Sequence, residues 1–171
     1  MDDELIMEVD DGDKRIGVLP REEFYNGKHI HRAAHLLLFN SRGDVLLQKR
    51  SSGKRWYPGL YTYSVSGTVA DESYRDCMKR EIQEEIGLSV PFRKALKYYY
   101  KDEYDNVFNE IFIARSDSKI IPDKGEMSRI KWVGLESLMK DIKFNPQRYT
   151  PPFVKGIMLF FEKYKDHNRL I

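Results

Sequence analysis

Two apolar segments separated by a short polar turn constrain the fold of this chain more than any other feature. They span residues 33–39 and 45–48, and the turn between them is Asn40-Ser41-Arg42-Gly43-Asp44. Gly43 can adopt a positive φ without steric cost, as tight turns of this kind require. We therefore expect the two segments to form an antiparallel pair at the centre of a sheet.

Strand and helix patterns continue along the chain without the regular order of βαβ units. Strands are predicted at 60–66, 95–101, 107–114 and 129–133, helices at 73–86, 135–142 and 153–165, and a hairpin at 5–18. Gly87 fits the end of the first helix, and Pro151 and Pro152 fit the first turn of the last. The predicted fold class is α+β, with a mixed sheet and flanking helices.

The length of 171 residues is that of one domain. We expect residues 1–171 to fold as a unit that includes an N-terminal hairpin within residues 1–20 and a C-terminal helix at 152–166. Both of these elements are candidate contacts of a homodimer.

Charge and hydropathy restrict the classes of partner. The 29 Lys and Arg residues against 27 Asp and Glu leave a net charge of +2, so no whole-chain attraction favours nucleic acid or an acidic membrane. The longest apolar runs are far below the ~20 residues of a membrane span, and the acidic residues 1–4 do not resemble a signal peptide. The single cysteine, Cys77, cannot form an internal disulfide. We expect a cytoplasmic protein with no nucleic-acid or membrane partner.

Three glutamates lie close together in the helix predicted at 73–86. Glu81 and Glu84 are three residues apart, and Glu81 and Glu85 four, so their carboxylates share one helix face and repel each other. A bound divalent cation would turn this repulsion into attraction, and hard oxygen ligands favour Mg²⁺, with Mn²⁺ as an alternative. Glutamates at this spacing also occur on ordinary solvated helix faces, so the surrounding residues decide between the two interpretations.

The surrounding residues resemble a known family signature. Glu72, seven further residues and Arg80-Glu81-Ile82-Gln83-Glu84-Glu85-Ile86-Gly87-Leu88 match the signature of the Nudix hydrolases at every specified position. The upstream glycine of that signature falls on Ser66, whereas this chain has Gly67. We therefore expect a loop one residue shorter than usual before Glu72.

The resemblance implies a fold, a reaction and a set of roles. The fold is a Nudix-type sandwich of a mixed β-sheet between α-helices, and the reaction is Mg²⁺-dependent hydrolysis of a nucleoside diphosphate derivative or other organic diphosphate. Glu81 and Glu85 would be the main metal ligands, and Glu84 a further ligand or proton acceptor. Arg80 and Glu72 would form an orienting ion pair beside Gly67.

Segments outside the signature resemble the Nudix branch related to isopentenyl diphosphate isomerase. They are residues 29–35, 46–51, Tyr57-Pro58-Gly59-Leu60 and Ser64-Val65. Arg50 and Lys54 match the positions that bind the diphosphate in that branch, and the neighbouring Lys49 and Arg55 make this region basic.

Isomerase activity itself is not expected, although an isomerase homologue remains an alternative. The isomerase cysteine and the histidine two residues later correspond here to Ser66 and Thr68, and a serine hydroxyl is a poor acid or base. Of the paired glutamates in a later strand only Glu110 is present, with Phe108 at the other position. Glu110 is a candidate metal ligand or base, because alternation places it with Phe108 on one strand face.

Two further questions stay open at the level of sequence. A non-catalytic module that binds a phosphorylated ligand is an alternative, although such a module has no need of three convergent carboxylates. The aromatic residues Tyr98–Tyr100, Tyr104 and Phe108 could stack on a nucleobase or simply line the sheet, so they do not identify the substrate.

Overall fold

β3 (His31–Phe39) is the central strand of a mixed sheet in the computed structural model, which describes residues 4–165. β8 (Asn106–Arg115) runs parallel to it along its whole length, and β7 (Phe92–Lys101) continues the sheet antiparallel to β8. The other strands of this sheet are β4 (Asp44–Arg50), β5 (Tyr61–Thr62), β6 (Val65–Thr68) and β9 (Met127–Gly134).

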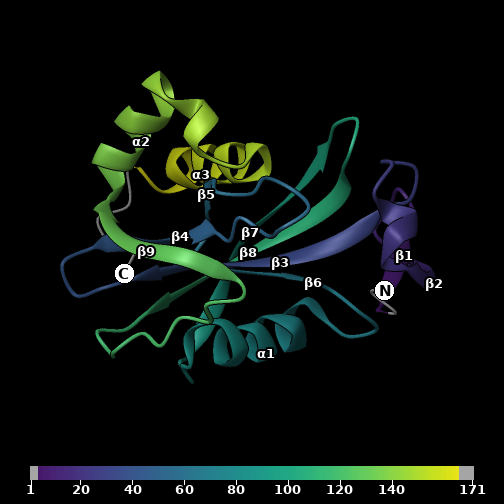
Figure 1. Cartoon of the computed structure of the whole chain (residues 1–171), viewed down its shortest axis with the longest axis horizontal. Helices are drawn as coiled ribbons and strands as arrows, with labels where there is room; N and C mark the ends of the chain where they lie inside the picture. Colours follow the sequence, from purple (N-terminus) through teal and green to yellow (C-terminus); the bar gives the residue numbers. More distant parts are fainter. Residues whose placement is uncertain (1–3, 166–171) are drawn as a thin grey trace.

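Helices cover both faces of this sheet, as Figure 1 shows. α1 (Tyr74–Ile86) packs on one face, and α2 (Leu135–Phe144) and α3 (Pro151–Tyr164) pack on the other. Two short 3₁₀ helices, Arg21–Phe24 and Pro146–Arg148, lie in the connections. This arrangement confirms the α+β fold class and the sandwich of a sheet between helices.

Local residues explain where α1 begins and ends. The Ser73 hydroxyl accepts a hydrogen bond from the Asp76 N–H, which caps the first turn, and Gly87 ends the helix with a left-handed φ of 67°. Between them Cys77, Met78, Ile82 and Ile86 recur at helical spacing and are buried against the sheet. Cys77 is thus a core residue of this helix.

A two-stranded hairpin, β1 (Leu5–Val9) and β2 (Arg15–Pro20), precedes the main sheet and confirms the hairpin predicted there. It adjoins the start of β3 through the bridge between Val9 and Ile30. Residues 1–3 of the predicted N-terminal segment, and residue 166 of the predicted last helix, lie outside the described residues. None of the helices within residues 4–165 combines the length and the apolar character needed to cross a membrane.

The predicted antiparallel pair of β3 and β4 is confirmed, but it is confined to the residues next to the turn. Apart from one register pair at the turn, Phe39 with Val45, the two strands have other partners: β3 pairs with β6 and β8, and β4 pairs with β5 and β9. The predicted strand at 60–66 is two strands, because the chain leaves β4 after Thr62 and joins β3 at Val65.

Ser64 explains how β3 and β4 diverge. Its hydroxyl donates to the Leu46 carbonyl (2.6 Å) on β4 and accepts from the Leu38 N–H (2.8 Å) on β3, while its own N–H donates to the Leu36 carbonyl (2.9 Å). A fully buried side chain thus satisfies backbone groups that a continuous β3–β4 ladder would have paired.

Replacing Ser64 with alanine should destabilise the protein. The change leaves the buried Leu38 N–H and Leu46 carbonyl without their partner, which costs about 1–3 kcal/mol of unfolding free energy for each buried unsatisfied group. Urea unfolding measures this loss. The exposed Ser89→Ala should stay within about 0.5 kcal/mol of the parent, and equal stabilities of the two variants would refute the role given to Ser64.

Candidate active site

A cavity of about 740 Å³ opens where β4 and β6 separate, and the signature helix α1 contributes one of its walls. Seven predicted site residues line it, namely Arg50, Lys54, Gly67, Arg80, Glu81, Glu84 and Glu85. The other walls come from the loop between β4 and β5, the turn between β7 and β8, and the segment before β9. The structure therefore brings the predicted acidic and basic residues into one space.

Glu85 is the most deeply buried carboxylate of the cavity, with 3% of its surface exposed. Its Oε2 accepts hydrogen bonds from the Gln48 side chain on β4 (3.0 Å) and from the Ser66 N–H on β6 (3.3 Å). Burial, followed by the charges of Glu81 and Glu126, raises the pKa of Glu85 to about 8. A neighbouring cation is what would favour the charged form of this group.

Glu81 packs directly against the backbone of Gly67. A Cβ atom at position 67 would lie 2.6 Å from both Cδ and Oε1 of Glu81, which is closer than atoms of real side chains approach. Burial also raises the pKa of Glu81, against the lowering effect of Arg80. Gly67 is therefore required by the close approach of the Glu81 side chain.

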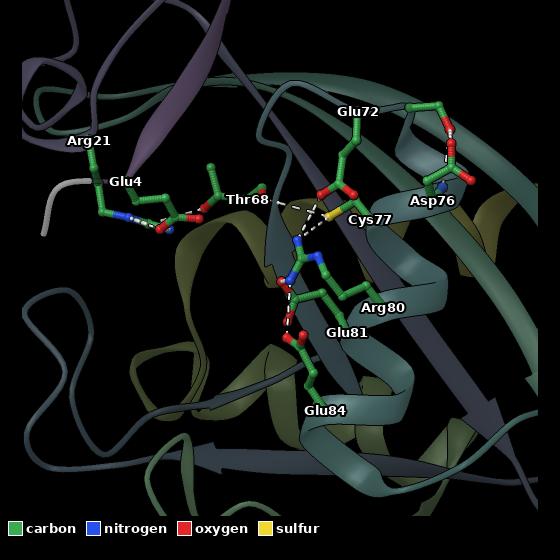
Figure 2. Close-up of polar contacts among 10 residues, drawn as sticks. Glu4, Arg21, Thr68, Glu72, Asp76, Cys77, Arg80, Glu81 and Glu84 are labelled. Carbon is green, nitrogen blue, oxygen red and sulfur yellow. Dashed lines mark hydrogen bonds and ion pairs between the residues drawn. The ribbon is translucent and has the colours of Figure 1, made fainter.

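Arg80 lies among three of the signature glutamates, as Figure 2 shows. Its guanidinium contacts Glu72 at 2.7 Å, Glu81 at 2.7 Å and Glu84 at 3.1 Å. The predicted ion pair with Glu72 is thus present. The positive charge of Arg80 offsets the repulsion among the glutamates. Its several N–H donors hold the three carboxylates close to one another.

Arg50 and Lys54 form the basic wall of the cavity. Arg50 is half-buried, and its Nε donates to the Trp56 carbonyl (2.9 Å) at the far end of the loop. Lys54 forms an ion pair with Glu126, which also lines the cavity. Both cations face the space that the glutamates enclose.

Glu110 does not join this group. It lies on β8 on the face covered by α1, is 8% exposed, and forms an ion pair with Lys94 at 2.7 Å. It is absent from the lining of the cavity. The structure therefore gives the buried carboxylate a partner of its own on the neighbouring strand.

Sequence reasoning missed three groups that build the site. Gln48 holds Glu85, Glu126 adds a carboxylate opposite α1, and His35 bonds Ser66 (3.0 Å) and Asn109 (2.8 Å) at the cavity wall. No short sequence pattern identifies Gln48 or Glu126. Each is a single polar residue in a strand or loop, and the residue it contacts is distant in sequence. The spacing of His35 from His31 on one strand face was the one available hint.

The residues fit a hard divalent cation in chemistry, although the side chains as they stand do not enclose one. Within residues 4–165 no three His, Cys, Asp or Glu side chains converge closely enough to hold a metal. Arg80 occupies the space between Glu81 and Glu84, while the buried Glu85 and the glycine that accommodates Glu81 are features a metal site explains. Mg²⁺ or Mn²⁺ suits such an all-oxygen donor set.

Comparison with protein families decides the assignment. Residues 29–152 match a family model described as "NUDIX domain". The chain belongs to the Nudix family. This match covers more than half of the chain and includes all the residues that line the acidic and basic walls, so the protein is a Nudix hydrolase.

Two relatives of this Nudix hydrolase have names that state an activity. A Methanosarcina mazei protein named prenyl-diphosphate phosphatase is 48% identical over 163 residues, covering 93% of this chain and 96% of the relative. A Photorhabdus laumondii protein named isopentenyl-diphosphate Delta-isomerase 2 is 32% identical over 178 residues, covering 99% of each.

A solved structure supports the fold. The crystal structure of a Deinococcus radiodurans protein superposes with a TM-score of 0.81 at 20% identity, covering 92% of this chain and 99% of that one. The fold of this Nudix hydrolase thus has a close match among known structures.

Gly67→Ala should weaken metal binding more than folding. The added methyl group meets Cγ, Cδ and Oε1 of Glu81, so this side chain must rotate away, and the free energy of unfolding should fall by about 1–3 kcal/mol. Because Glu81 then leaves its position, Mn²⁺ affinity measured by calorimetry should fall roughly 10–100-fold. Gly17→Ala is the matched control, since a Cβ there makes ordinary contact with Glu8. Unchanged Mn²⁺ affinity in Gly67→Ala would remove Glu81 from the metal site.

Glu85 should make the metal-free enzyme less stable as the pH rises. Its pKa of about 8 in the folded state exceeds the ordinary value of 4.5, so between these values the unfolded chain loses a proton that the folded chain keeps. The stability associated with this group is complete below pH 4.5 and is lost as the pH approaches 8.

Glu85→Gln removes this loss, so the variant should gain stability over wild type by a few kcal/mol between pH 5 and pH 8. Chemical unfolding of both proteins in chelator at the two pH values measures the difference, and titrating groups that do not interact with Glu85 cancel. A stability difference that does not change with pH would contradict the burial of an uncompensated carboxylate.

Proposed function

We propose that this Nudix hydrolase cleaves the diphosphate group of a prenyl diphosphate with the help of Mg²⁺. The observation that carries the proposal is one cavity that contains the carboxylates of α1, the basic side chains Arg50 and Lys54, and an aromatic wall. A substrate with a charged diphosphate head and an apolar tail complements such a cavity. The name of the Methanosarcina mazei relative, prenyl-diphosphate phosphatase, supports the same substrate class.

Glu81, Glu84 and Glu85 are the proposed metal ligands. Mg²⁺ bound there would neutralise charge on the phosphate oxygens and acidify a water molecule. Gln48 and the Ser66 N–H keep Oε2 of Glu85 directed between β4 and β6, and Gly67 leaves room for Glu81. Arg80, with its contact to Glu72, orients the remaining glutamates.

Arg50 and Lys54 are the proposed diphosphate-binding residues. Arg50 offers guanidinium N–H groups besides the Nε that holds Trp56, and burial lowers its pKa relative to a solvated arginine. An anionic ligand would offset that cost of burial. Lys54 can exchange Glu126 for a phosphate oxygen without leaving the cavity, because both residues line it.

Ser66 and His35 favour hydrolysis over isomerisation. Asn109 donates from Nδ2 to the Val107 carbonyl, so its Oδ1 accepts from His35 Nε2, and His35 Nδ1 accepts the Ser66 hydroxyl proton. Burial lowers the pKa of His35 to about 4, which keeps the ring neutral in this arrangement. The Ser66 hydroxyl is therefore engaged in a hydrogen bond within the wall, and none of the described residues that line the cavity has a thiol.

The test is turnover of a panel of prenyl and nucleoside diphosphate compounds, with Mg²⁺ and with chelator. We expect Mg²⁺-dependent release of phosphate from prenyl diphosphates and no formation of an isomer. Loss of partners around a metal ligand costs roughly 10–100-fold, so loss of the ligand in Glu85→Gln should lower kcat about 100-fold or more.

Glu110→Gln is the matched control, because it removes a buried carboxylate outside the cavity. It should leave kcat within about threefold, since its partner Lys94 also lies outside the cavity. Turnover confined to nucleoside diphosphate derivatives would contradict the proposed substrate. Equal losses in Glu110→Gln and Glu85→Gln would contradict the proposed site.

A further inference from the structure

Three aromatic side chains from three separate segments meet at one wall of the cavity, and we call them the aromatic lip: Tyr25, Trp56 and Tyr104. The ring centroids of Trp56 and Tyr104 are 5.2 Å apart, and those of Trp56 and Tyr25 are 5.7 Å apart. Tyr104 is 46% exposed, so the lip lies at the border of cavity and solvent. A cluster of aromatic side chains at a cavity entrance is typical of a ligand-binding site.

Polar contacts hold the three segments of the aromatic lip together. The Asp102 carboxylate accepts from the hydroxyl groups of Tyr57 (3.2 Å) and Tyr100 (2.9 Å) and from the Tyr104 N–H (2.8 Å). The Asn106 side chain donates to the Gly27 carbonyl (3.0 Å), which ties the segment of Tyr25 to the same turn. The lip is therefore organised before any ligand arrives.

The loop that carries Trp56 is strained at the next residue. Tyr57 has a φ of 52°, a left-handed backbone conformation that residues other than glycine rarely adopt. Its hydroxyl donates a hydrogen bond to Asp102. Strain of this kind persists where the surroundings over-determine the conformation, and it clusters at functional sites. Here it sets the direction of Trp56, whose carbonyl is also held by Arg50.

The same loop connects the aromatic lip to the proposed diphosphate site. Lys54 is two residues from Trp56 in the chain, and Arg50 bonds its backbone, so the basic wall and the lip are adjacent surfaces of one cavity. The lining of the cavity also includes the apolar or small residues Ala33, Val107 and Gly67, and its volume of about 740 Å³ can hold an extended chain.

The geometry of the aromatic lip favours a flexible apolar chain over a nucleobase. The Arg55 guanidinium lies 4.3 Å from the ring centroid of Tyr25 and 5.8 Å from that of Trp56, and these cation–π contacts help to fix the two rings. The rings of the lip are moreover tilted by 37° and 54° to each other and offer no parallel slot. A flexible hydrocarbon chain can follow such a surface.

We propose that the aromatic lip binds the hydrocarbon chain of the prenyl diphosphate beyond its first isoprene unit and so sets the preference for long chains. This proposal rests on the proposed function. Each methylene group buried there contributes about fourfold to affinity. Long-chain substrates therefore lose binding when the lip is cut back, whereas a five-carbon substrate ends before reaching it.

The first test compares kcat and KM for dimethylallyl and farnesyl diphosphates in Trp56→Ala. We expect KM for the farnesyl substrate to rise about tenfold or more, kcat to change little, and the dimethylallyl substrate to be affected less than about twofold. Trp56→Phe should recover most of the farnesyl preference. Phe144→Ala, which removes an aromatic side chain that is 75% exposed on α2, should leave both substrates unchanged. Equal losses for both chain lengths, or none for either, would overturn the proposal.

A second test measures binding without turnover and without a variant of the lip. The chain has two tryptophans, and Trp132 packs against the core on the α1 side of the sheet, so Trp132→Phe leaves Trp56 as the one tryptophan. Farnesyl monophosphate should change the emission of Trp56 saturably, with an affinity about tenfold or more above that of dimethylallyl monophosphate. Equal affinity for the two, or no change in emission, would contradict the proposal.

The two tests separate failure of this proposal from failure of the proposed function. If wild type hydrolyses prenyl diphosphates but shows no dependence on the lip, the proposed function stands and the lip has no role in it. If wild type hydrolyses no prenyl diphosphate, the proposed function fails, and the fluorescence titration with farnesyl monophosphate decides by itself whether the lip binds such chains.

Discussion

The buried carboxylate of Glu85 is the constraint on which the rest of the site depends. Glu85 lies on α1, which packs on one face of the sheet, and its carboxylate reaches the cavity. There it accepts hydrogen bonds from the Gln48 side chain and the Ser66 N–H. Such a position exists because β3 and β4 diverge beyond their turn, where Ser64 satisfies backbone groups of both strands. The metal-free protein therefore holds an acidic group whose burial opposes its charge, which a bound cation would relieve.

The cavity is organised as three surfaces of different chemistry. The acidic surface comes from one continuous helix, whose spacing sets its geometry, and Arg80 keeps its glutamates together. The basic surface comes from the end of β4 and the loop that follows it, and the aromatic surface comes from loops, which Asp102 and Arg50 tie into place. This division places the proposed metal ligands on a rigid helix and the proposed substrate contacts mostly on loops, where sequence can vary without disturbing the core.

Much of this fold was predictable from sequence, and the exceptions have physical reasons. The limits of α1 follow from Ser73, Gly87 and an apolar face, all local signals, and the α+β class follows from the order of strands and helices. Most strand partners were not predictable: the turn at Asn40–Asp44 is real, but beyond it the ladder it suggested is replaced by pairings with β6, β8 and β9. Pairing between strands distant in the chain depends on packing that no short segment encodes.

The candidate site divides in the same way. The signature residues were predicted to lie together from their spacing, because they lie in α1 or in the segment just before it. They are Glu72, Arg80, Glu81, Glu84 and Glu85. Glu110 satisfied the same kind of argument by strand alternation, yet its face of β8 is covered by α1 and its charge is paired with Lys94. Alternation identifies a face, whereas the residues packed on that face decide what its side chains contact. Gln48, Glu126 and the aromatic lip depend on such long-range contacts and had no signal of their own.

The most direct test of the account is a crystal structure of the enzyme with Mn²⁺ and a farnesyl diphosphate analogue in which the bridging oxygen is replaced by a non-hydrolysable group. The account predicts anomalous density for Mn²⁺ between Glu81 and Glu85, at metal–oxygen distances of about 2.0–2.3 Å. It also predicts diphosphate oxygens at Arg50 and Lys54, and the hydrocarbon chain against Trp56. Mn²⁺ bound away from these glutamates, or a chain directed away from the aromatic lip, would contradict it.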